Sequence, residues 1–371
     1  MLSGHVQQKK GRFYMVLNLR DDTGKWKPKW IATGLPIKGN KRRAEEMLRA
    51  KITEYELADS KVNGDSDKIL FTDFMKEWLL MRKSSLEETT YSSYYLTVVK
   101  SVCPYFEPLK LTLRDIEKNP QYIQKYYSYL TNERGLKGNS VRRHHANIRK
   151  ALQHAFKTDL IASNPADKVD KPKVLDYPVT YYSTDELNQL FSLASDSKIF
   201  LIIVMAAFYG LRRSEVLGLK WRAIDFKKKT ISISHTVTNA IDDETGKLFL
   251  VQKDRTKNKS SHRSLPLVSE VEFLLLERKK QNKEFRKLCG NCYTDEYAEY
   301  VFVDELGFLH KPNYVTRVFT ALLKDNELTH IRFHDLRHPR VKLGLKNIFN
   351  FFNPHIRDRI PVFAHASVLQ F

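Results

Sequence analysis

The sequence predicts a multidomain, mainly helical protein with small β-elements. Its 371 residues exceed the needs of one ordinary domain, so we expect two or three domains. Hydrophobic residues make up 42% of the chain, which is enough to build packed cores. Strand-like composition is confined to two regions, one near the N-terminus and one after residue 230, while helical spacing of apolar residues prevails elsewhere.

Residues 1–65 form the first predicted domain. Arg12–Arg20 and Lys27–Gly34 have strand composition, and Asn40 is suited to cap a following helix. A small antiparallel sheet backed by one helix is therefore expected, joined to the next domain by a polar linker over residues 61–68. The apolar stripe of that helix contains Ala44, Met47, Leu48, Ile52 and Tyr55.

The second predicted domain, residues 68–172, is helical. Phe71–Met81 and Thr89–Val99 show helical spacing, and Lys137–Lys157 shows it best. This last segment holds six Lys or Arg residues and no acidic one, which favours a DNA-facing helix over an ordinary solvated basic face. Its apolar side gathers Val141, Ile148, Leu152, Ala155 and Phe156, and its basic arc gathers Arg142, Arg149, Lys150 and Lys157, with Arg143 at the edge.

The third predicted domain, residues 180–371, has α+β character. Ser183–Glu186 is typical of a helix start with acids in the first turn. Ile199–Tyr209 is the longest apolar run; it is too short to cross a bilayer and predicts a buried helix. Thr230–Val237 and Lys247–Gln252 alternate at period two around a turn and predict a hairpin.

The chain is strongly basic, with 63 Lys and Arg against 43 Asp and Glu, a net charge of +20. Such a charge indicates a polyanionic partner, with nucleic acid ahead of a membrane surface, although a merely soluble basic protein is the alternative. No signal-peptide pattern opens the chain and the cysteine count is three, so we expect a cytoplasmic location without disulfides. Cys289-Gly-Asn-Cys292 has no second pair nearby and is interpreted as a loop rather than a zinc site.

Two short basic motifs carry the chemistry. Gly210–Glu215 contains Arg212, and His334–His338 contains Arg337; two guanidiniums that converge could clamp a phosphate. Between them lies a basic loop with Lys257 and Lys259, ahead of the strand-like Arg263–Leu267. Cleaving a phosphodiester without metal requires charge stabilisation, a proton for the leaving oxygen and a nucleophile. No acidic cluster suited to two metal ions stands out, so we expect neither a metal nor a cofactor.

An Arg, a Lys and then His-x-x-Arg, in that order, resembles the catalytic set of the tyrosine recombinases, of the integrase type carried by conjugative transposons and related phages. The resemblance implies that Arg212 and Arg337 grip the phosphate and that His334 is the histidine of the family's His-x-x-Arg motif. It also implies that Lys257 is the general acid, with Lys259 as the alternative. Glu215, one helical turn after Arg212, is expected to orient it, unless it is an exposed helix charge.

The same resemblance extends to the three domains. It implies an arm-type DNA-binding domain whose sheet enters a major groove, a helical core-binding domain of the SAM-like kind, and a catalytic domain. The implied partners are double-stranded DNA at arm-type and core-type sites, further copies of the chain in a synaptic tetramer, and an accessory excision factor, with no membrane. Expected DNA contacts in the first domain come from Arg12, Tyr14, Arg20 and Lys27, in addition to the basic arc of the second.

The family's nucleophilic tyrosine has no clear counterpart. The last tyrosine of the sequence is Tyr314, which precedes the His-x-x-Arg box. If Phe-Ala-His stands for Tyr-Ala-His, Phe363 occupies the nucleophile's position and His355 is the second histidine. A frame-shifted or decayed end is the alternative to this substitution. The candidate functions are therefore an integrase, a cleavage-deficient DNA-binding relative, and an enzyme similar to type IB topoisomerases.

Overall fold

The computed structural model describes residues 3–20, 26–63, 66–173, 181–254 and 263–337. The side chains of residues 19, 20, 26 and 55–63 also lie outside this description. The chain divides into two compact units, Met1–Asp176 and Tyr177–Phe371. No helix in the described ranges is long and apolar enough to span a membrane.

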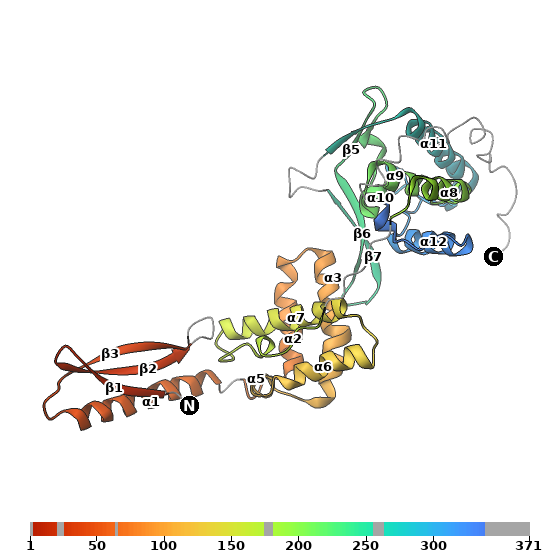
Figure 1. Cartoon of the computed structure of the whole chain (residues 1–371). Coiled ribbons are helices and arrows are strands. Elements are labelled where there is room, and N and C mark those ends of the chain that lie inside the picture. Colours follow the sequence, from red (N-terminus) through yellow and green to blue (C-terminus); the bar gives the residue numbers. More distant parts are fainter. Residues whose placement is uncertain (1–2, 21–25, 64–65, 174–180, 255–262, 338–371) are drawn as a thin grey trace. The chain divides into compact units, whose positions relative to one another are not determined.

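The first unit begins with a three-stranded antiparallel sheet in the order β1-β2-β3 (Figure 1). Its strands are β1 (Ser3–Lys9), β2 (Arg12–Arg20) and β3 (Trp26–Pro36). Lys10 and Gly11 join β1 to β2 with φ angles of 49° and 74°, the left-handed pair that a two-residue hairpin turn requires. The family resemblance implies a three-stranded sheet, but the position of β1 was not predicted, because its polar side chains give little strand signal.

Helix α1 (Lys41–Asn63) covers one face of this sheet and packs Leu48 against Met15 and Leu17. The predicted sheet-plus-helix is therefore present. The helix runs three residues into the segment predicted as a linker. Asn40 precedes the helix, but its side-chain amide donates back to the carbonyls of Pro36 and Lys38 at 3.1 and 3.0 Å.

Helices form the rest of the first unit, as predicted. They are α2 (Phe71–Arg82), α3 (Glu88–Thr97), α4 (Cys103–Phe106), α5 (Leu113–Lys118), α6 (Gln121–Asn132) and α7 (Gly138–Lys157). Between α3 and α4 the chain widens into a π turn, Val98–Val102, ahead of Pro104, which has no N–H to donate. In α7, Val141, Ile148, Leu152 and Ala155 are buried, as their spacing predicts.

The second unit contains five α-helices among its described residues. They are α8 (Thr184–Ala194), α9 (Phe200–Tyr209), α10 (Arg213–Leu217), α11 (Ser269–Cys289) and α12 (Pro312–Asp325). The Ser183 hydroxyl accepts from the Glu186 N–H and the Glu186 carboxylate accepts from the Ser183 N–H, the cap that the sequence predicted. Helix α9 lies at the centre of the core, as expected from its apolar run.

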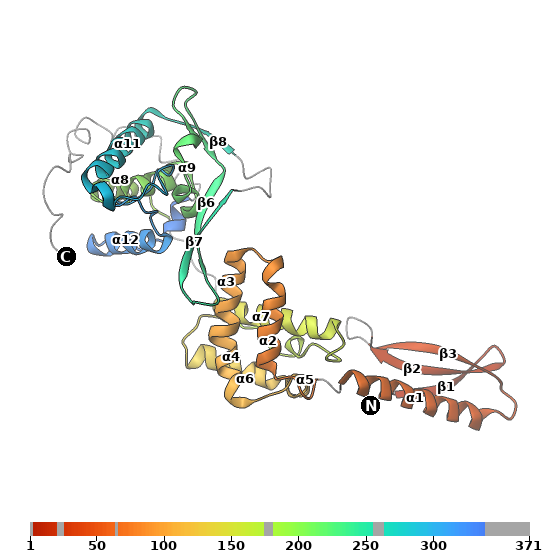
Figure 2. The same cartoon turned by 180° about the vertical axis from the view of Figure 1, so that it is seen from behind.

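Two small antiparallel sheets complete this unit (Figure 2). One has the order β4-β5-β8, from β4 (Ile224–Asp225), β5 (Thr230–Ile233) and β8 (Arg263–Pro266). The other is the hairpin of β6 (His235–Ile241) and β7 (Leu248–Asp254). The hairpin was predicted, but the run Thr230–Val237 was wrongly assigned to a single strand. It is divided at Ser234, and its first half pairs with β8 instead.

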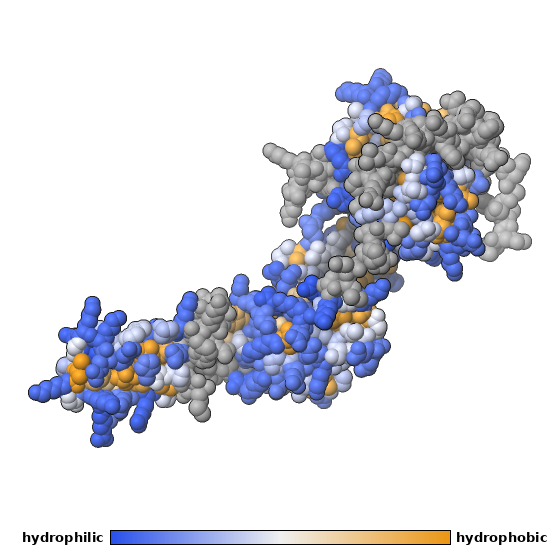
Figure 3. Space-filling model, viewed as in Figure 1, coloured by the Kyte–Doolittle hydropathy of each residue, from blue (hydrophilic) through white to orange (hydrophobic). Residues whose placement is uncertain are grey.

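The cysteines form no disulfide: Cys103, Cys289 and Cys292 are all free. Cys289 is the last residue of α11 and Cys292 closes the 3-10 turn Gly290–Cys292, so this pair stands at a helix end rather than in an open loop. Across the described ranges, no group of three His, Cys, Asp or Glu side chains could hold a metal ion. On the face seen in Figure 3, hydrophilic residues predominate in the described part of each unit.

Candidate phosphate-binding site

Arg212 lies at a sharp junction between two helices. Helix α9 ends at Tyr209 and is capped by Gly210, whose φ of 60° is left-handed and therefore suits glycine. Arg212 is extended, with φ −68° and ψ 148°, and α10 begins at the next residue. Its side chain is 47% exposed, so the guanidinium remains accessible to a ligand.

Glu215, in the first turn of α10, forms hydrogen bonds with Arg212. Its carboxylate accepts from the backbone N–H and from Nη1 of Arg212, both at 2.8 Å. The predicted contact is therefore present, and the alternative of an exposed helix charge is wrong, because the Glu215 side chain is fully buried. Burial alone would raise the pKa of Glu215, but bonds from the Arg212 N–H, Arg263 and the Arg212 guanidinium lower it overall, so the group stays ionised.

Arg337 reaches the same junction from the far end of the unit. It closes the 3-10 turn Phe333–Arg337, and its Nε donates to the carbonyl of Gly210 at 2.7 Å. The two residues are separated by 127 positions in the sequence. The two arginines of the predicted clamp therefore belong to neighbouring segments of the folded unit.

His334 lies in the electrostatic field of both arginines. Partial burial lowers the pKa of His334, and the positive charges of Arg337 and Arg212 lower it further, against the opposing effect of Asp335. The imidazole is therefore neutral near pH 7 and can accept a proton. Asp335 itself is buried and forms a bidentate pair with the Arg332 guanidinium, with separations from 2.8 to 3.2 Å. This pair fixes the turn that carries the histidine.

The remaining predicted catalytic residues belong to two segments outside the described ranges. Lys257 and Lys259 fall in residues 255–262, and His355 and Phe363 fall in residues 338–371, all outside the described residues. Their roles stay predictions. The flanks of the lysine segment are described: Asp254 ends β7 before it and Arg263 opens β8 after it.

Arg213 has a different role from its neighbour. Its Nη1 donates to the hydroxyl of Thr316 on α12, and burial lowers the pKa of its guanidinium. Only one member of the Arg212–Arg213 pair therefore faces the site. Tyr314, on the same helix α12, packs against the core and stacks on His310, with ring centroids 5.6 Å apart. No feature of this packing directs the Tyr314 hydroxyl toward Arg212 or Arg337.

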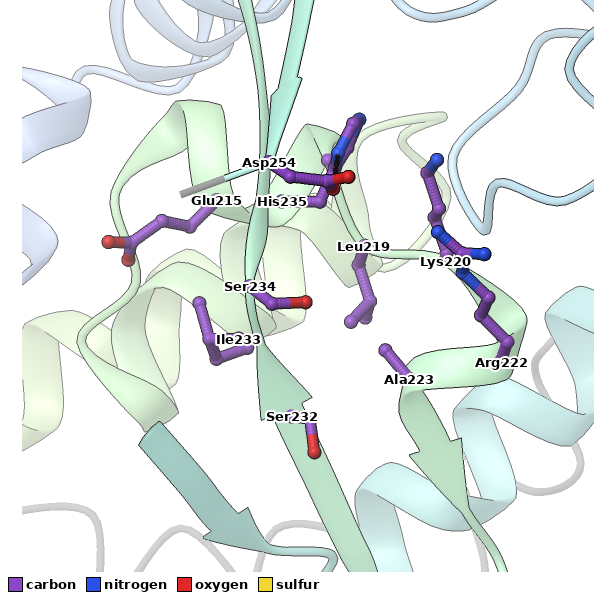
Figure 4. A pocket seen from close by; sticks show the side chains of 11 residues that line it. Glu215, Leu219, Lys220, Arg222, Ala223, Ser232, Ile233, Ser234, His235 and Asp254 are labelled. Carbon is purple, nitrogen blue, oxygen red and sulfur yellow. Dashed lines mark hydrogen bonds and ion pairs between the residues drawn. The ribbon is translucent and has the colours of Figure 1, made fainter. Parts of the chain in front are cut away.

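A small polar pocket beside the site contains residues that sequence reasoning missed (Figure 4). His235 Nδ1 lies 2.6 Å from the Asp254 carboxylate, and His235 Nε2 lies 2.9 Å from the hydroxyl of Tyr300. In Figure 4, Lys220 and Arg222 lie on the opposite side of the pocket from Glu215. The signal was present in the hairpin: pairing β6 with β7 outward from the turn sets His235 opposite Asp254.

Two of the five basic side chains on the arc of α7 are bound by other residues of the protein. Arg149 forms a two-bond pair with Asp167, the shorter bond being 2.6 Å, and Lys150 donates to the Tyr94 hydroxyl at 2.5 Å. Arg149 therefore has a counter-charge from outside the helix, in the 3-10 turn Pro165–Asp167, and the role of α7 as a DNA-facing helix stays a prediction. Lys150 is nevertheless exposed, as are the other three basic residues of the arc, Arg142, Arg143 and Lys157.

The sheet of the first unit has one face that α1 leaves uncovered. Tyr14 is on this face, where its ring meets Trp30 edge-on at 6.2 Å and the ammonium of Lys9 lies 5.0 Å over the Trp30 ring. Lys27 pairs with Leu19, on the same side of the sheet as the buried Leu17, so the structure puts it on the α1 face. Lys27 is exposed there, and its predicted DNA contact stays a prediction.

Arg12 is exposed beside the β1–β2 turn. The side chain of Arg20 lies outside the described part of the chain, so its predicted DNA contact stays a prediction.

Comparison with known proteins agrees with this arrangement. The chain matches the phage integrase family over residues 181–340 and the phage integrase SAM-like domain over residues 70–171. It is also 25% identical to the ICEBs1 integrase of Bacillus subtilis over 340 residues, covering 90% of this chain and 85% of that one. The chain belongs to the phage integrase family of tyrosine recombinases.

Solved structures of the family share the fold. The recombinase is 17% identical to the Tn1549 transposon integrase in complex with transposon right end DNA, with a TM-score of 0.59, covering 81% of this chain and 96% of that one. It is 15% identical to the lambda integrase in a tetramer bound to a Holliday junction, with a TM-score of 0.54 and 98% of both chains covered. The relatives place this recombinase near the integrases of conjugative transposons, as its motifs predicted.

Proposed function

We propose that this recombinase binds duplex DNA at recombination sites and holds the scissile phosphate between Arg212 and Arg337. The hydrogen bond from Arg337 to the Gly210 carbonyl is the observation that carries the proposal, because it sets both guanidiniums at one junction. Paired guanidiniums stabilise the negative charge that develops on the non-bridging oxygens during cleavage. The related integrases named above were solved on DNA, which supports a nucleic-acid ligand.

In an intact form of such a recombinase, the phenol oxygen of a C-terminal tyrosine would attack phosphorus and the bond to the 5′ oxygen would break, leaving a 3′-phosphotyrosine. His334, neutral near pH 7, takes or shares the phenolic proton. The ammonium of Lys257, or of Lys259 two positions later, gives a proton to the departing oxygen. His355 is proposed as the second histidine of the site. Neither a metal nor a cofactor is part of this scheme.

We also propose that the 371-residue chain binds DNA without cleaving it. No tyrosine follows Tyr314 in these 371 residues, and a phenylalanine at position 363 has no oxygen to attack phosphorus. The packing of Tyr314 on His310 supports a structural role for that side chain. The alternative activity, that of a type IB topoisomerase, does not explain the presence of the β1–β3 sheet and α1.

The three predicted domains would each have a separate role in binding or cleaving DNA. Residues 1–65 would bind arm-type sites and residues 68–172 core-type sites, while residues 180–371 would carry the catalytic groups. The lambda integrase tetramer on a Holliday junction supports assembly of four copies at a synapse. An accessory factor for excision is proposed by analogy with the family alone.

A suicide substrate tests the proposal. The full chain is first used to select its preferred duplex from a random pool, and that duplex is then nicked beside the cleavage position. We expect binding without a covalent adduct from the unaltered chain. If Phe363 occupies the nucleophile's position, Phe363→Tyr should yield an adduct, and adding Arg212→Ala should remove it again. An adduct from the unaltered chain would refute the cleavage-deficient assignment, and failure to retain any duplex would refute DNA binding.

A further inference from the structure

Glu215 is shared by two arginines, only one of which belongs to the proposed clamp. Its Oε1 accepts from Arg212 Nη1 at 2.8 Å, and its Oε2 accepts from Arg263 Nη2 at 2.8 Å. The side chain of Glu215 is fully buried, whereas those of Arg212 and Arg263 are 47% and 30% exposed. The carboxylate is thus the buried centre of a three-residue cluster with both guanidiniums at its rim.

The charge of this cluster differs from that of a simple ion pair. A buried carboxylate with one guanidinium is neutral overall, so Glu215 alone would offset the charge that Arg212 offers to a phosphate. Adding Arg263 leaves one net positive charge on the cluster. In a partly buried setting that difference is felt over several ångströms, because water screens it poorly.

Arg263 also connects strand β8 to helix α10 through its contact with Glu215. Arg263 is the first residue of β8 and pairs with Ile233 of β5, so its backbone is held by a sheet. It directly follows residues 255–262, which contain Lys257. Through Glu215, this sheet edge is connected to the first residues of α10. The two ends of the cluster are therefore fixed by different elements, which limits how Arg212 can turn.

We propose that Arg263 is a positioning residue for the phosphate site: it fixes the Glu215 carboxylate and restores the positive charge that Glu215 would otherwise cancel at Arg212. The inference rests on the proposed role of Arg212 in gripping phosphate. Arg263 acts through Glu215 rather than through direct contact with the reacting atoms. Its removal should therefore weaken recognition of one particular phosphate and leave contacts elsewhere on the duplex intact.

A methylphosphonate scan tests this without requiring cleavage. The full chain binds the duplex selected from a random pool, synthesised with a single uncharged methylphosphonate at each central position in turn. The clamped phosphate is the position whose neutralisation weakens binding roughly tenfold in the unaltered chain but not in Arg212→Ala. At that position we expect Arg263→Ala to reduce the effect to about twofold, and Arg263→Lys, which keeps the charge, to retain most of it.

The control is Arg286→Ala, which removes an exposed arginine paired with Asp295 in the same unit. It should leave the scan unchanged. Should Arg263→Ala fail to fold by circular dichroism, Arg263→Gln keeps a donor toward Glu215 without the charge and should still lose part of the effect. A folded Arg263→Ala or Arg263→Gln with the full tenfold effect would overturn the inference. A scan with no Arg212-dependent position would instead refute the proposed clamp.

Discussion

The Nε of Arg337 donates a 2.7 Å hydrogen bond to the carbonyl of Gly210, two residues before Arg212. A guanidinium that is fixed at Nε can present its two terminal nitrogens to a ligand in a defined direction. The bond therefore both assembles the site and orients one half of it. A lysine in place of Arg337 would keep the charge but would lose this fork-shaped geometry.

The first prediction follows from this bond. Arg337→Lys should weaken binding of the selected duplex by about 1–2 kcal/mol at the clamped phosphate, because the charge remains while the bidentate geometry is lost. Fluorescence anisotropy with ordinary and methylphosphonate duplexes measures the difference. Equal affinities of the unaltered chain and the Arg337→Lys variant on both duplexes would argue that this guanidinium does not touch phosphate.

The second prediction concerns the basic arc of α7. Arg142→Ala with Arg143→Ala should lower the log–log salt slope of DNA binding by roughly two, at ~0.9 per lost phosphate contact. Arg149→Ala with Lys150→Ala is the matched double variant. It should change the slope less, because these two side chains are already bound to Asp167 and Tyr94. Identical slopes for both doubles and the unaltered chain would place this helix away from DNA.

The third prediction separates the two faces of the N-terminal sheet. Tyr14→Ala and Trp30→Ala should each weaken binding to arm-type DNA severalfold, because these rings are on the open face. Lys27→Ala, on the α1 face, should have little effect beyond the loss of general positive charge. Footprinting on a duplex that carries both site types measures arm and core protection together. Loss of core protection in the Trp30→Ala variant would contradict independent arm binding.

The fourth prediction is a pH dependence of stability in the helical part of the first unit. Burial lowers the pKa of His144 to about 4, and its Nδ1 lies 2.8 Å from the Tyr126 hydroxyl. Since the folded pKa is below the unfolded value of about 6.5, the neutral histidine stabilises the fold fully above pH 6.5. That stability is lost as pH falls from about 6.5 toward 4.

Chemical denaturation of the full chain across this pH range provides the measurement. Glutamine does not titrate, so His144→Gln should reduce the change in unfolding free energy across this pH range by roughly 3 kcal/mol at most. His310, whose pKa burial also lowers to about 4, titrates in the other unit with the same sign. The difference in unfolding free energy between the variant and the unaltered chain isolates the contribution of His144. If the pH dependence of the variant equals that of the unaltered chain, His144 is not held neutral by burial.

Much of the fold follows from local patterns in the sequence. The strand β2 has the bounds that its composition predicted, and α7 buries four of the five residues that its spacing selects, with Phe156 only partly buried. The wrong strand assignment after residue 230 has a non-local cause. Whether Thr230–Val237 forms one strand or two depends on β8, whose residues are about thirty positions away and leave no trace in the local pattern. Partner choice between strands is a non-local property.

The candidate site was predicted from the order of its motifs rather than from any single residue. Arg212, His334 and Arg337 were found in this way, and the structure brings them together. The contacts of charged side chains could not be predicted where the partner comes from another segment. Arg149 is bound by Asp167, which lies outside its helix, and Arg213 donates to Thr316 on α12. Charge counted along one helix therefore overestimates the charge available to DNA.

The separation of Gly210 and Arg337 by 127 positions has a consequence for synthesis of the chain. A ribosome completes α9 and α10 long before it reaches the 3-10 turn Phe333–Arg337. Domains generally fold as units in the order of their synthesis, so the helices of the first unit can be complete while the phosphate site has only one of its two arginines. A nascent or prematurely terminated chain would thus present its basic surfaces without the geometry for strand cleavage.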